Sequence, residues 1–273
     1  MYTRRLLPDE AVVARLRAAG CVFAEEEAEI LTSSAGTAGE LDAMILRRAS
    51  GEPLEQVVGW ASFRGLRLDV DPGVFVPRRR SEFLVAVAAG LAAGLAAGSP
   101  VVVDLCCGTG ALGVAVAAAL GASLGGDRAA ELHAADLDPA AVACARRNVA
   151  RVGGRVYAGD LFCALPASVR GRVNVLICNA PYVPTTEIAF MPAEARDHEA
   201  LMALDGGTDG LAILRRVADA AAGWLAPGGV LLVETSEQQA PEMADAMAAG
   251  GLAPRTWSDD ESGATVVTGS RPR

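Results

Sequence analysis

The chain has 273 residues, of which 52% are hydrophobic and 4% aromatic, and its formal net charge is -9. A chain of this length can form one large domain with a small appendage, or two modest domains. The negative charge argues against broad binding to a phosphate backbone, because such binding needs a basic surface.

The sequence has the features of a cytoplasmic protein. Residues 1–10 carry charges and a proline where a signal peptide needs an apolar stretch, and the weakly polar stretch 83–98 is too short and too rich in Ala and Gly to span a bilayer. The six cysteines mostly lie in apolar runs, and none has the paired spacing of a metal site. We therefore expect a soluble cytoplasmic protein with reduced cysteines, no metal and no membrane partner.

The N-terminal part of the chain is predicted to be helical. Residues 8–50 have apolar side chains at helical spacing, broken at Gly20 and in the polar stretch 32–39. We expect a small helical N-terminal domain over residues 1–55, which serves packing or substrate docking and has no chemistry of its own.

The pattern changes to that of a β-hairpin after residue 50. Four apolar residues alternate with polar ones: Phe63, Leu66, Leu68 and Val70. Asp71-Pro72-Gly73 then predicts a turn into a second strand, 74–76, so that residues 56–80 form a β-hairpin linker. Three arginines at 78–80 follow, in a run that is usually a solvated surface. Ser81 could cap the next helix, which consists of small residues and is expected to reach about residue 97.

A glycine-rich turn follows the next predicted strand. This strand, 101–105, contains Asp104 and leads into a turn with Gly108 and Gly110, after which the pattern is helical. Such a unit is the first β-loop-α of a doubly wound sheet, and its glycines let the backbone approach a ligand closely. Cys106 stands where a first glycine is usual.

Two further predicted strands end in acidic residues. Residues 132–135 lead to Asp136, which is expected to bind ribose hydroxyls, although its long spacing from the glycines predicts a loop insertion at 121–130. Residues 155–158 lead to Asp160, which could accept a hydrogen bond from an adenine amino group. One such acid could be only a helix cap, but three at the strand ends of one α/β series favour a binding site.

The predicted buried strand 173–178 is followed by Asn179-Ala180-Pro181-Tyr182. Asn179 offers a side-chain carbonyl and Ala180 a backbone carbonyl, whereas Pro181 has no N–H, so the turn presents acceptors with few donors. An amide or amine NH2 group would fit these acceptors, and Tyr182 could lay its ring against a planar amide. Taken alone, the tetrapeptide could also be a structural proline turn with a half-buried tyrosine.

The rest of the chain completes an α/β pattern. Residues 184–198 are irregular and could form a lid over the site. The elements expected after them are a helix (209–225), a turn (227–229), a strand (230–234) and a final antiparallel strand (264–268). The predicted fold class is α/β, with a doubly wound, mostly parallel sheet in residues 81–273.

With these residues assembled, the chain resembles the HemK/PrmC-like protein-glutamine N-methyltransferases, a family of class I S-adenosylmethionine-dependent enzymes. The resemblance runs from about residue 51 to residue 235 and rests on six blocks: Pro53-Leu54-Glu55-Gln56, Phe63-Arg64-Gly65-Leu66, Val76-Pro77-Arg78, the turn after Asp104, Asn179-Ala180-Pro181-Tyr182, and ALDGGTDG at 203–210. It implies a Rossmann-like seven-stranded methyltransferase sheet and the cofactor S-adenosyl-L-methionine.

The same resemblance implies roles for individual residues. Those expected at the cofactor are Asp104, Cys106, Gly108, Gly110, Asp136, Leu137, Asp160, Leu161 and Asn179. Those expected at the methyl acceptor are Asn179 and the Ala180 carbonyl, which grip the amide, Pro181 in the same turn, and Tyr182 and Phe75 as two walls.

Two departures from the family's usual blocks bear on the substrate. Ala180 stands where a proline is usual, which keeps the acceptor carbonyl but relaxes the turn. The usual Pro-Arg-Pro-Glu-Thr-Glu is here Pro77-Arg78-Arg79-Arg80-Ser81-Glu82, which adds positive charge beside the substrate cleft. The chain is thus expected to be a variant branch with an Asn-Ala-Pro-Tyr motif.

The leading hypothesis is methyl transfer from the sulfonium to the side-chain amide nitrogen of a glutamine in a protein, such as a peptide chain release factor or a ribosomal protein. The alternative is methylation of a small amine or amide, such as an amino acid or a guanidine. Net acidity and the lack of a separate basic domain disfavour adenine methylation of nucleic acid. The intact strand-end acids disfavour an inactive cofactor-binding module.

Overall fold

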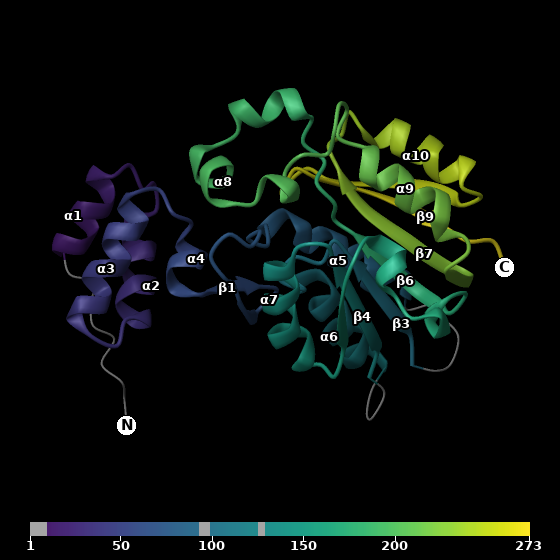
Figure 1. The fold of residues 1–273 in the computed structure, drawn as a ribbon, viewed down its shortest axis with the longest axis horizontal. Helices are drawn as coiled ribbons and strands as arrows, with labels where there is room; N and C mark the ends of the chain where they lie inside the picture. Colours follow the sequence, from purple (N-terminus) through teal and green to yellow (C-terminus); the bar gives the residue numbers. More distant parts are fainter. Residues whose placement is uncertain (1–9, 93–98, 125–128) are drawn as a thin grey trace.

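The computed structural model describes residues 10–92, 99–124 and 129–273. Figure 1 shows short helices at one end of the molecule, a larger α/β body at the other end, and a segment with a two-stranded sheet between them. None of the helices in these ranges is long and apolar enough to cross a membrane.

Three helices form the N-terminal unit: α1 (Glu10–Ala18), α2 (Ala24–Ser34) and α3 (Ala38–Ala49). Their apolar faces meet in a core of their own that includes Leu16, Leu31 and Ile45, as the helical spacing predicts. The helix α3 begins with a capping box, in which the Glu40 N–H donates a hydrogen bond to Thr37 Oγ1 at 3.2 Å. Packing and capping therefore both define this unit.

The β-hairpin is present, but its turn differs from the predicted one. The elements are α4 (Leu54–Val58), β1 (Trp60–Phe63) and β2 (Leu66–Asp69). The turn lies at Arg64-Gly65, whose φ angles of 48° and 74° are the two positive values of a type I′ hairpin turn. Asp71-Pro72-Gly73 only redirects the chain, and the residues 74–76 after it are not a strand.

The body is a seven-stranded sheet in the order β5-β4-β3-β6-β7-β9-β8. The strands are β3 (Val101–Leu105), β4 (Glu131–Asp136), β5 (Arg155–Ala158), β6 (Val173–Cys178), β7 (Leu225–Thr235), β8 (Ala253–Asp259) and β9 (Ala264–Ser270). The first five are parallel, and β9 runs antiparallel to both β7 and β8. The predicted α/β class with a doubly wound, mostly parallel sheet is confirmed.

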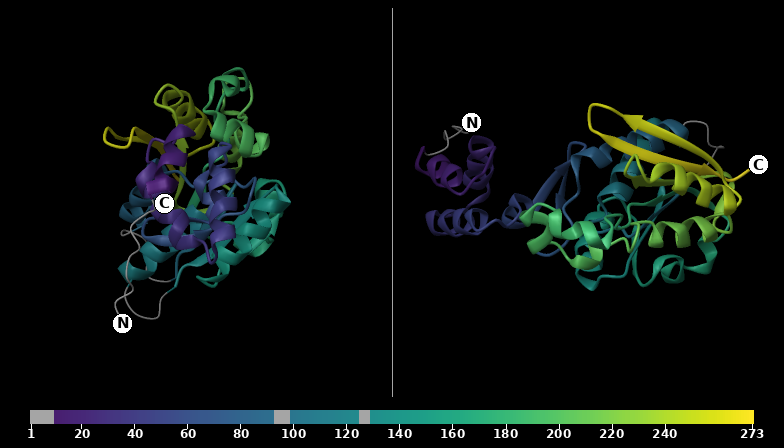
Figure 2. Two further views of the ribbon diagram at one scale, coloured as in Figure 1. Left: turned by 90° about the vertical axis from the view of Figure 1, so that its left-hand side faces the viewer. Right: turned by 90° about the horizontal axis from the view of Figure 1, so that it is seen from above.

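Helices cover both faces of this sheet (Figure 2). One face packs against α5 (Glu82–Ala92), α6 (Ala111–Leu124) and α7 (Pro139–Ala150), and the other against α9 (Ala212–Ala221) and α10 (Ala240–Ala249). Because side chains alternate across a strand, Val102 lies in the first layer, and Val101 and Val103 lie in the second. The strand β3 is therefore buried from both sides, which explains its continuous apolar run.

Three elements of the C-terminal half differ from the prediction. The helix expected from residue 209 begins at Ala212, because Gly210 has a φ of 78° and the Leu211 N–H donates to Asp209 Oδ1 at 3.0 Å. The strand β7 runs through the expected turn at 227–229. The edge strand β8 is not predicted, since most of its side chains are exposed and show no apolar alternation.

Two further expectations fall partly outside the described residues. The helix predicted to reach residue 97 is α5, which is described to Ala92, and residues 93–98 lie outside the described ranges. The loop insertion predicted at 121–130 is partly helical, because α6 extends to Leu124. Residues 125–128 lie outside the description.

The segment predicted to be an irregular lid, 184–198, contains the short helices η4 (Thr185–Phe190) and α8 (Ala193–His198), and η5 (Leu201–Ala203) follows it. It arches between the N-terminal helices and the body (Figure 1). Arg48 of α3 pairs with Glu194 at 3.4 Å, and Gln56 Nε2 of α4 donates to the His198 carbonyl at 3.4 Å. The division of the chain into a domain, a linker and a second domain at 1–55, 56–80 and 81–273 stays a prediction.

Candidate active site

A pocket opens at the carboxyl ends of β3, β4 and β6, where the strand order of the sheet reverses. The chain runs outward from β3 to β5 and then places β6 on the other side of β3. Ligands of open α/β sheets bind at such a switch point. Most of the predicted site residues line the pocket: Phe75, Cys106, Gly108, Asp136, Leu137, Asp160, Leu161, Asn179, Ala180, Pro181 and Tyr182. Asp104 and Gly110 do not line it.

The glycine-rich turn after β3 brings backbone to the pocket. Cys106 and Gly108 both have a φ of 53°, a conformation that costs a residue with a side chain about 1–2 kcal/mol. Cys106 therefore occupies a position that a glycine would take without strain. Gly110 serves a different purpose, because a Cβ there would lie 2.8 Å from Val149 Cγ2 of α7. This glycine permits the close packing of the turn against α7.

Asp136 presents a fixed carboxylate at the end of β4. Its Oδ2 accepts a hydrogen bond from the Gly108 N–H at 2.8 Å, and its Oδ1 accepts one from the Asp138 N–H at 2.9 Å. Burial raises the pKa of Asp136, while these backbone donors act in the opposite direction. Each carboxylate oxygen can accept a further hydrogen bond. The carboxylate thus fits a pair of ribose hydroxyls, such as those of S-adenosylmethionine.

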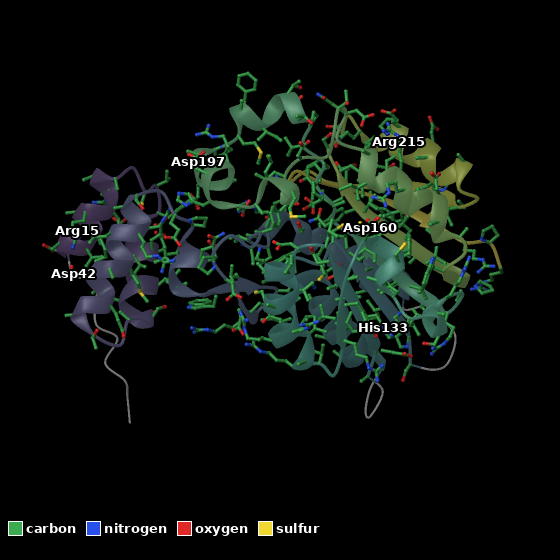
Figure 3. All side chains as sticks on the ribbon, in the orientation of Figure 1. Arg15, Asp42, His133, Asp160, Asp197 and Arg215 are labelled. Carbon is green, nitrogen blue, oxygen red and sulfur yellow. The ribbon has the colours of Figure 1, made fainter. Side chains whose placement is uncertain are left out.

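Asp160 lies at the same edge of the sheet, after β5. Figure 3 shows it close to α9, the helix that carries Arg216, and Arg216 Nη2 lies 2.5 Å from Asp160 Oδ2. This ion pair uses one carboxylate oxygen and leaves the other able to accept a further hydrogen bond. Leu137, which is 58% exposed, and Leu161, with a φ of 48°, add apolar side chains that could contact a planar base.

Asp104 is buried beneath the pocket, although the sequence predicts it as a cofactor ligand. Asp104 is 1% exposed, and its Oδ2 accepts a hydrogen bond from the Gly113 N–H at 2.8 Å. Burial raises the pKa of Asp104 to about 8, and Oδ1 has no partner within the described part of the chain. Its contact with Gly113 joins β3 to the first turn of α6.

The buried carboxyl group of Asp104 should make the stability of the protein depend on pH. Its pKa is about 8 in the folded protein and about 4 in an unfolded chain, so between these values only the folded state keeps the proton. The free energy of unfolding should therefore fall by about 1.4 kcal/mol per pH unit as the pH rises through this window. We expect Asp104→Asn to remove that decline while keeping an oxygen for Gly113.

Urea unfolding of both proteins at several pH values between about 4 and about 8 measures this difference. The other raised carboxyl groups, those of Asp136 and Glu199, are common to both proteins and cancel in the comparison. Parallel pH profiles for the two proteins would contradict the assignment.

Ser81 sets the orientation of the Asn179 side chain at the end of β6. Asn179 Nδ2 donates a hydrogen bond to Ser81 Oγ at 3.4 Å, and Ser81 is buried. With the amide nitrogen used in this way, Asn179 Oδ1 is the group left to accept from a ligand. Ser81 ends the short helix η1 (Arg79–Ser81), so the hydroxyl expected to cap the next helix holds the asparagine.

The segment 203–210 packs directly against the Asn179–Tyr182 turn. Gln239 Nε2 donates to the Tyr182 carbonyl at 2.9 Å, which fixes the backbone at the end of the turn. A Cβ on Gly206 would lie 2.6 Å from the Pro181 carbonyl oxygen. Gly206 therefore leaves no space for a side chain, and a larger residue there would press on the backbone of the tetrapeptide.

Tyr182 lies along the pocket with its hydroxyl anchored. The hydroxyl donates to Glu234 Oε1 at 3.1 Å. Burial, and after it the Glu234 carboxylate, raise the pKa of Tyr182 to about 12. Tyr182 therefore stays a neutral phenol near neutral pH and serves as a wall of the pocket.

Phe75, the second predicted wall, lies in an extended segment. Two residues that were not predicted to belong to the site hold this segment in place. Gln56 Nε2 donates to the Val74 carbonyl at 3.0 Å, and the Val76 N–H donates to Glu199 Oε1 at 3.1 Å. Gln56 belongs to one of the blocks that carry the family resemblance, which is a signal that could have found it. Glu199 lies in the region next to the predicted lid and has no such signal.

Asn148 of α7 is a further positioning residue that sequence reasoning missed. Its side chain is fully buried, and Nδ2 donates to the carbonyls of Asp69 and Thr109, each at 2.9 Å. Its Oδ1 accepts from the Asp69 N–H at 2.8 Å. Asn148 thus joins the hairpin to the glycine-rich turn. An amide on the buried face of a helix is the signal that could have revealed it.

Known proteins resemble this chain in sequence. Residues 67–250 match the family model described as Methyltransferase small domain. The release factor glutamine methyltransferase of Bifidobacterium longum is 34% identical, and the match covers 91% of this chain and 93% of that protein. The 4-amino-L-phenylalanine/4-methylamino-L-phenylalanine methyltransferase of Streptomyces pristinaespiralis is 38% identical, with 71% of this chain and 65% of that protein covered.

A solved structure shares the fold. The T. Thermophilus 16S rRNA N2 G1207 methyltransferase in complex with AdoMet and guanosine has a TM-score of 0.53 and 20% identity, with 78% of this chain and 49% of that chain covered. Taken with the family model and the relatives, this chain belongs to the HemK/PrmC-like release factor glutamine methyltransferase family and is an S-adenosylmethionine-dependent N-methyltransferase.

Proposed function

We propose that this enzyme methylates the side-chain amide nitrogen of a glutamine in a peptide chain release factor. The observation that carries the proposal is the set of acceptors at the Asn179–Tyr182 turn. Asn179 Oδ1 is left free because Nδ2 is bound to Ser81, and the Ala180 carbonyl accepts no hydrogen bond from the described residues. A primary amide has two N–H donors, which these two oxygens can accept.

The same pocket offers groups that would hold the cofactor. Asp136 would accept from the ribose hydroxyls, the backbone at Gly108 would approach the cofactor closely, and Asp160 would accept from the adenine amino group. S-adenosylmethionine supplies an activated methyl group when bound. The contribution of the protein is then to align the amide nitrogen with that methyl group, a proximity effect worth several kcal/mol (about 7 or more in favourable cases).

The acceptors also help the nitrogen to react. An amide nitrogen is a poor nucleophile because its lone pair is delocalised, and it becomes more positive as the new bond forms. Asn179 Oδ1 and the Ala180 carbonyl stabilise this charge through the two N–H bonds. His133 is not part of the pocket, since its ring bonds to Glu131 and Tyr157 near the far end of β4 (Figure 3). Proton loss after the transfer is therefore assigned to solvent.

The rim of the pocket supports a protein substrate. Met191 and Met202 line the pocket, and the neighbouring Phe190 and Leu201 are 86% and 61% exposed. Exposed apolar side chains around a pocket suit contact with another protein, and methionine adapts its shape to a partner.

A small aromatic amine is the second candidate acceptor. It is favoured by the relative from Streptomyces pristinaespiralis, which is named for 4-amino-L-phenylalanine, and by Ala180, which relaxes the turn where a proline is usual.

A transfer assay separates the two candidates. Purified enzyme is incubated with S-adenosylmethionine that carries a radiolabelled methyl group, together with the release factor from the same genome. We expect label on one glutamine, located by mass spectrometry of peptides, and none in a release factor with that glutamine replaced by alanine. Label that enters 4-amino-L-phenylalanine in a parallel reaction but no protein would overturn the proposal.

A further inference from the structure

Two arginines of one short segment each connect a wall of the pocket to a buried carboxylate. Arg78 lies with its guanidinium carbon 4.8 Å from the centre of the Phe75 ring, and its Nη2 is 2.6 Å from Glu199 Oε2. A guanidinium over an aromatic face at this distance is attracted to the ring. Arg78 therefore holds Phe75 from one side while Glu199 holds Arg78.

Arg80 repeats this arrangement at the other wall. Its guanidinium carbon lies 5.8 Å from the centre of the Tyr182 ring, and its Nε is 2.9 Å from Glu234 Oε1. Arg80 Nη2 also contacts the Tyr182 hydroxyl, which itself donates to the same Glu234 oxygen. Arg80, Tyr182 and Glu234 thus form a closed group of three, in which the phenol has a partner on each side.

The carboxylates are the fixed points of both groups. The side chains of Glu199 and Glu234 are 0% and 2% exposed, whereas those of Arg78 and Arg80 are 32% and 48% exposed. A buried carboxylate without a cation is strongly unfavourable, so each glutamate holds its arginine in place. The two glutamates come from different parts of the fold, Glu199 from the end of α8 and Glu234 from β7.

The pairing also changes the meaning of the three consecutive arginines. The sequence predicts added positive charge beside the cleft, but two of the three charges are balanced by buried carboxylates. Arg79 is exposed and has no ion pair among the described residues. At position 80 the family's usual block has an acid, which could not pair with Glu234, so this group of three depends on a residue that departs from that block.

We propose that Arg80 is a positioning residue that, with Glu234, sets the Tyr182 wall of the acceptor slot, and that Arg78 does the same for Phe75 with Glu199. The assignment rests on the proposed function only in placing the acceptor amide between the two rings. Both arginines also line the pocket. Their effect on the reaction is transmitted through the orientation of the two aromatic side chains.

Steady-state kinetics with three variants test the role of Arg80. Arg80→Gln should lower kcat/KM for the release factor about tenfold or more, because a displaced wall misaligns the acceptor. Arg80→Lys keeps the charge but cannot contact both Glu234 and the Tyr182 hydroxyl as the guanidinium does. Its kcat/KM should therefore fall less than that of Arg80→Gln. Arg79→Gln is the matched control and should behave as the unaltered enzyme, and the dissociation constant for S-adenosylmethionine should be the same in all four proteins.

A double variant tests whether Arg80 acts through Glu234. If the two side chains work as one group, Arg80→Gln combined with Glu234→Gln should lower kcat/KM by no more than about the larger single effect. Fully multiplied losses, or an Arg80→Gln enzyme with the kinetics of Arg79→Gln, would overturn the proposal.

A spectroscopic readout separates this proposal from the proposed function. The chain has three tyrosines, so nuclear magnetic resonance of protein with labelled tyrosine rings gives few signals, and Tyr182→Phe identifies that of Tyr182. Arg80→Gln should shift this signal, whereas Arg79→Gln should not. If no glutamine is methylated but the signal responds in this way, the proposed function fails and the positioning role stands. A signal that Arg80→Gln leaves unmoved overturns the positioning role whatever the acceptor is.

Discussion

Replacing Asn179 by alanine should nearly abolish methyl transfer while S-adenosylmethionine still binds. The substitution removes the Oδ1 acceptor and leaves one N–H of the amide unpaired as charge develops on the nitrogen. Loss of one such polar group at a reacting centre typically lowers kcat by about 10²- to 10³-fold. We expect a loss of this size with the release factor as acceptor, measured with labelled cofactor, and a cofactor dissociation constant that changes far less.

A second variant shows whether the orientation of Asn179 matters as well as its presence. Ser81→Ala keeps the asparagine but removes the hydroxyl that accepts from Asn179 Nδ2 at 3.4 Å. Ser81→Ala leaves the Asn179 amide in place but no longer fixes its orientation. The kcat of Ser81→Ala should therefore lie between that of the unaltered enzyme and that of Asn179→Ala. Full turnover of Asn179→Ala would sink the role of this side chain as the amide acceptor.

The strand ends were accessible from sequence because they depend on local patterns. The predicted strand at 155–158 and that at 173–178 coincide with β5 and β6, and Asp136 ends β4 as expected. Parallel strands bring their carboxyl ends to one edge of the sheet, so the pocket at that edge followed from the pattern.

What could not be predicted depends on long-range contacts or on turns without a strong signature. Arg78 and Glu199 are 121 residues apart, and Arg80 and Glu234 are 154 residues apart, so nothing local relates either arginine to its partner. Arg64 adopts a positive φ at the hairpin turn, which is unusual for a residue with a long side chain, and Asp71-Pro72-Gly73 is the more familiar turn sequence.

Asp104 shows that a motif can identify a residue near the site without showing whether its side chain lines the pocket. The motif identifies the acid in the strand before the glycine-rich turn, but side chains alternate across a strand, and burial is set by the helices packed on each face. Here Asp104 bonds to the Gly113 N–H beneath the pocket, whereas Asp136 and Asp160 line it. The sequence alone does not distinguish these two positions.

Replacing Gly210 by alanine should destabilise the protein more than an ordinary glycine substitution. Gly210 has a φ of 78°, and a Cβ there would lie 2.1 Å from the Tyr182 carbonyl oxygen and 2.4 Å from Gln239 Nε2. The left-handed backbone alone costs alanine about 1–2 kcal/mol. The clash with the Tyr182 backbone adds to this cost, so we expect a total loss of about 3 kcal/mol or more in the free energy of unfolding.

Gly59→Ala separates the two causes, because Gly59 has a φ of 79° but a Cβ there would meet nothing within 4 Å. It should show only the backbone cost of about 1–2 kcal/mol and keep its methyl transfer. Urea unfolding and transfer assays of both variants measure these effects. Equal losses of stability would show that a side chain added at position 210 does not press on the turn. Gly210→Ala should lose more stability than Gly59→Ala, and its folded fraction should turn over more slowly. Both results together would show that the 203–210 block acts by fixing the carbonyls of the tetrapeptide.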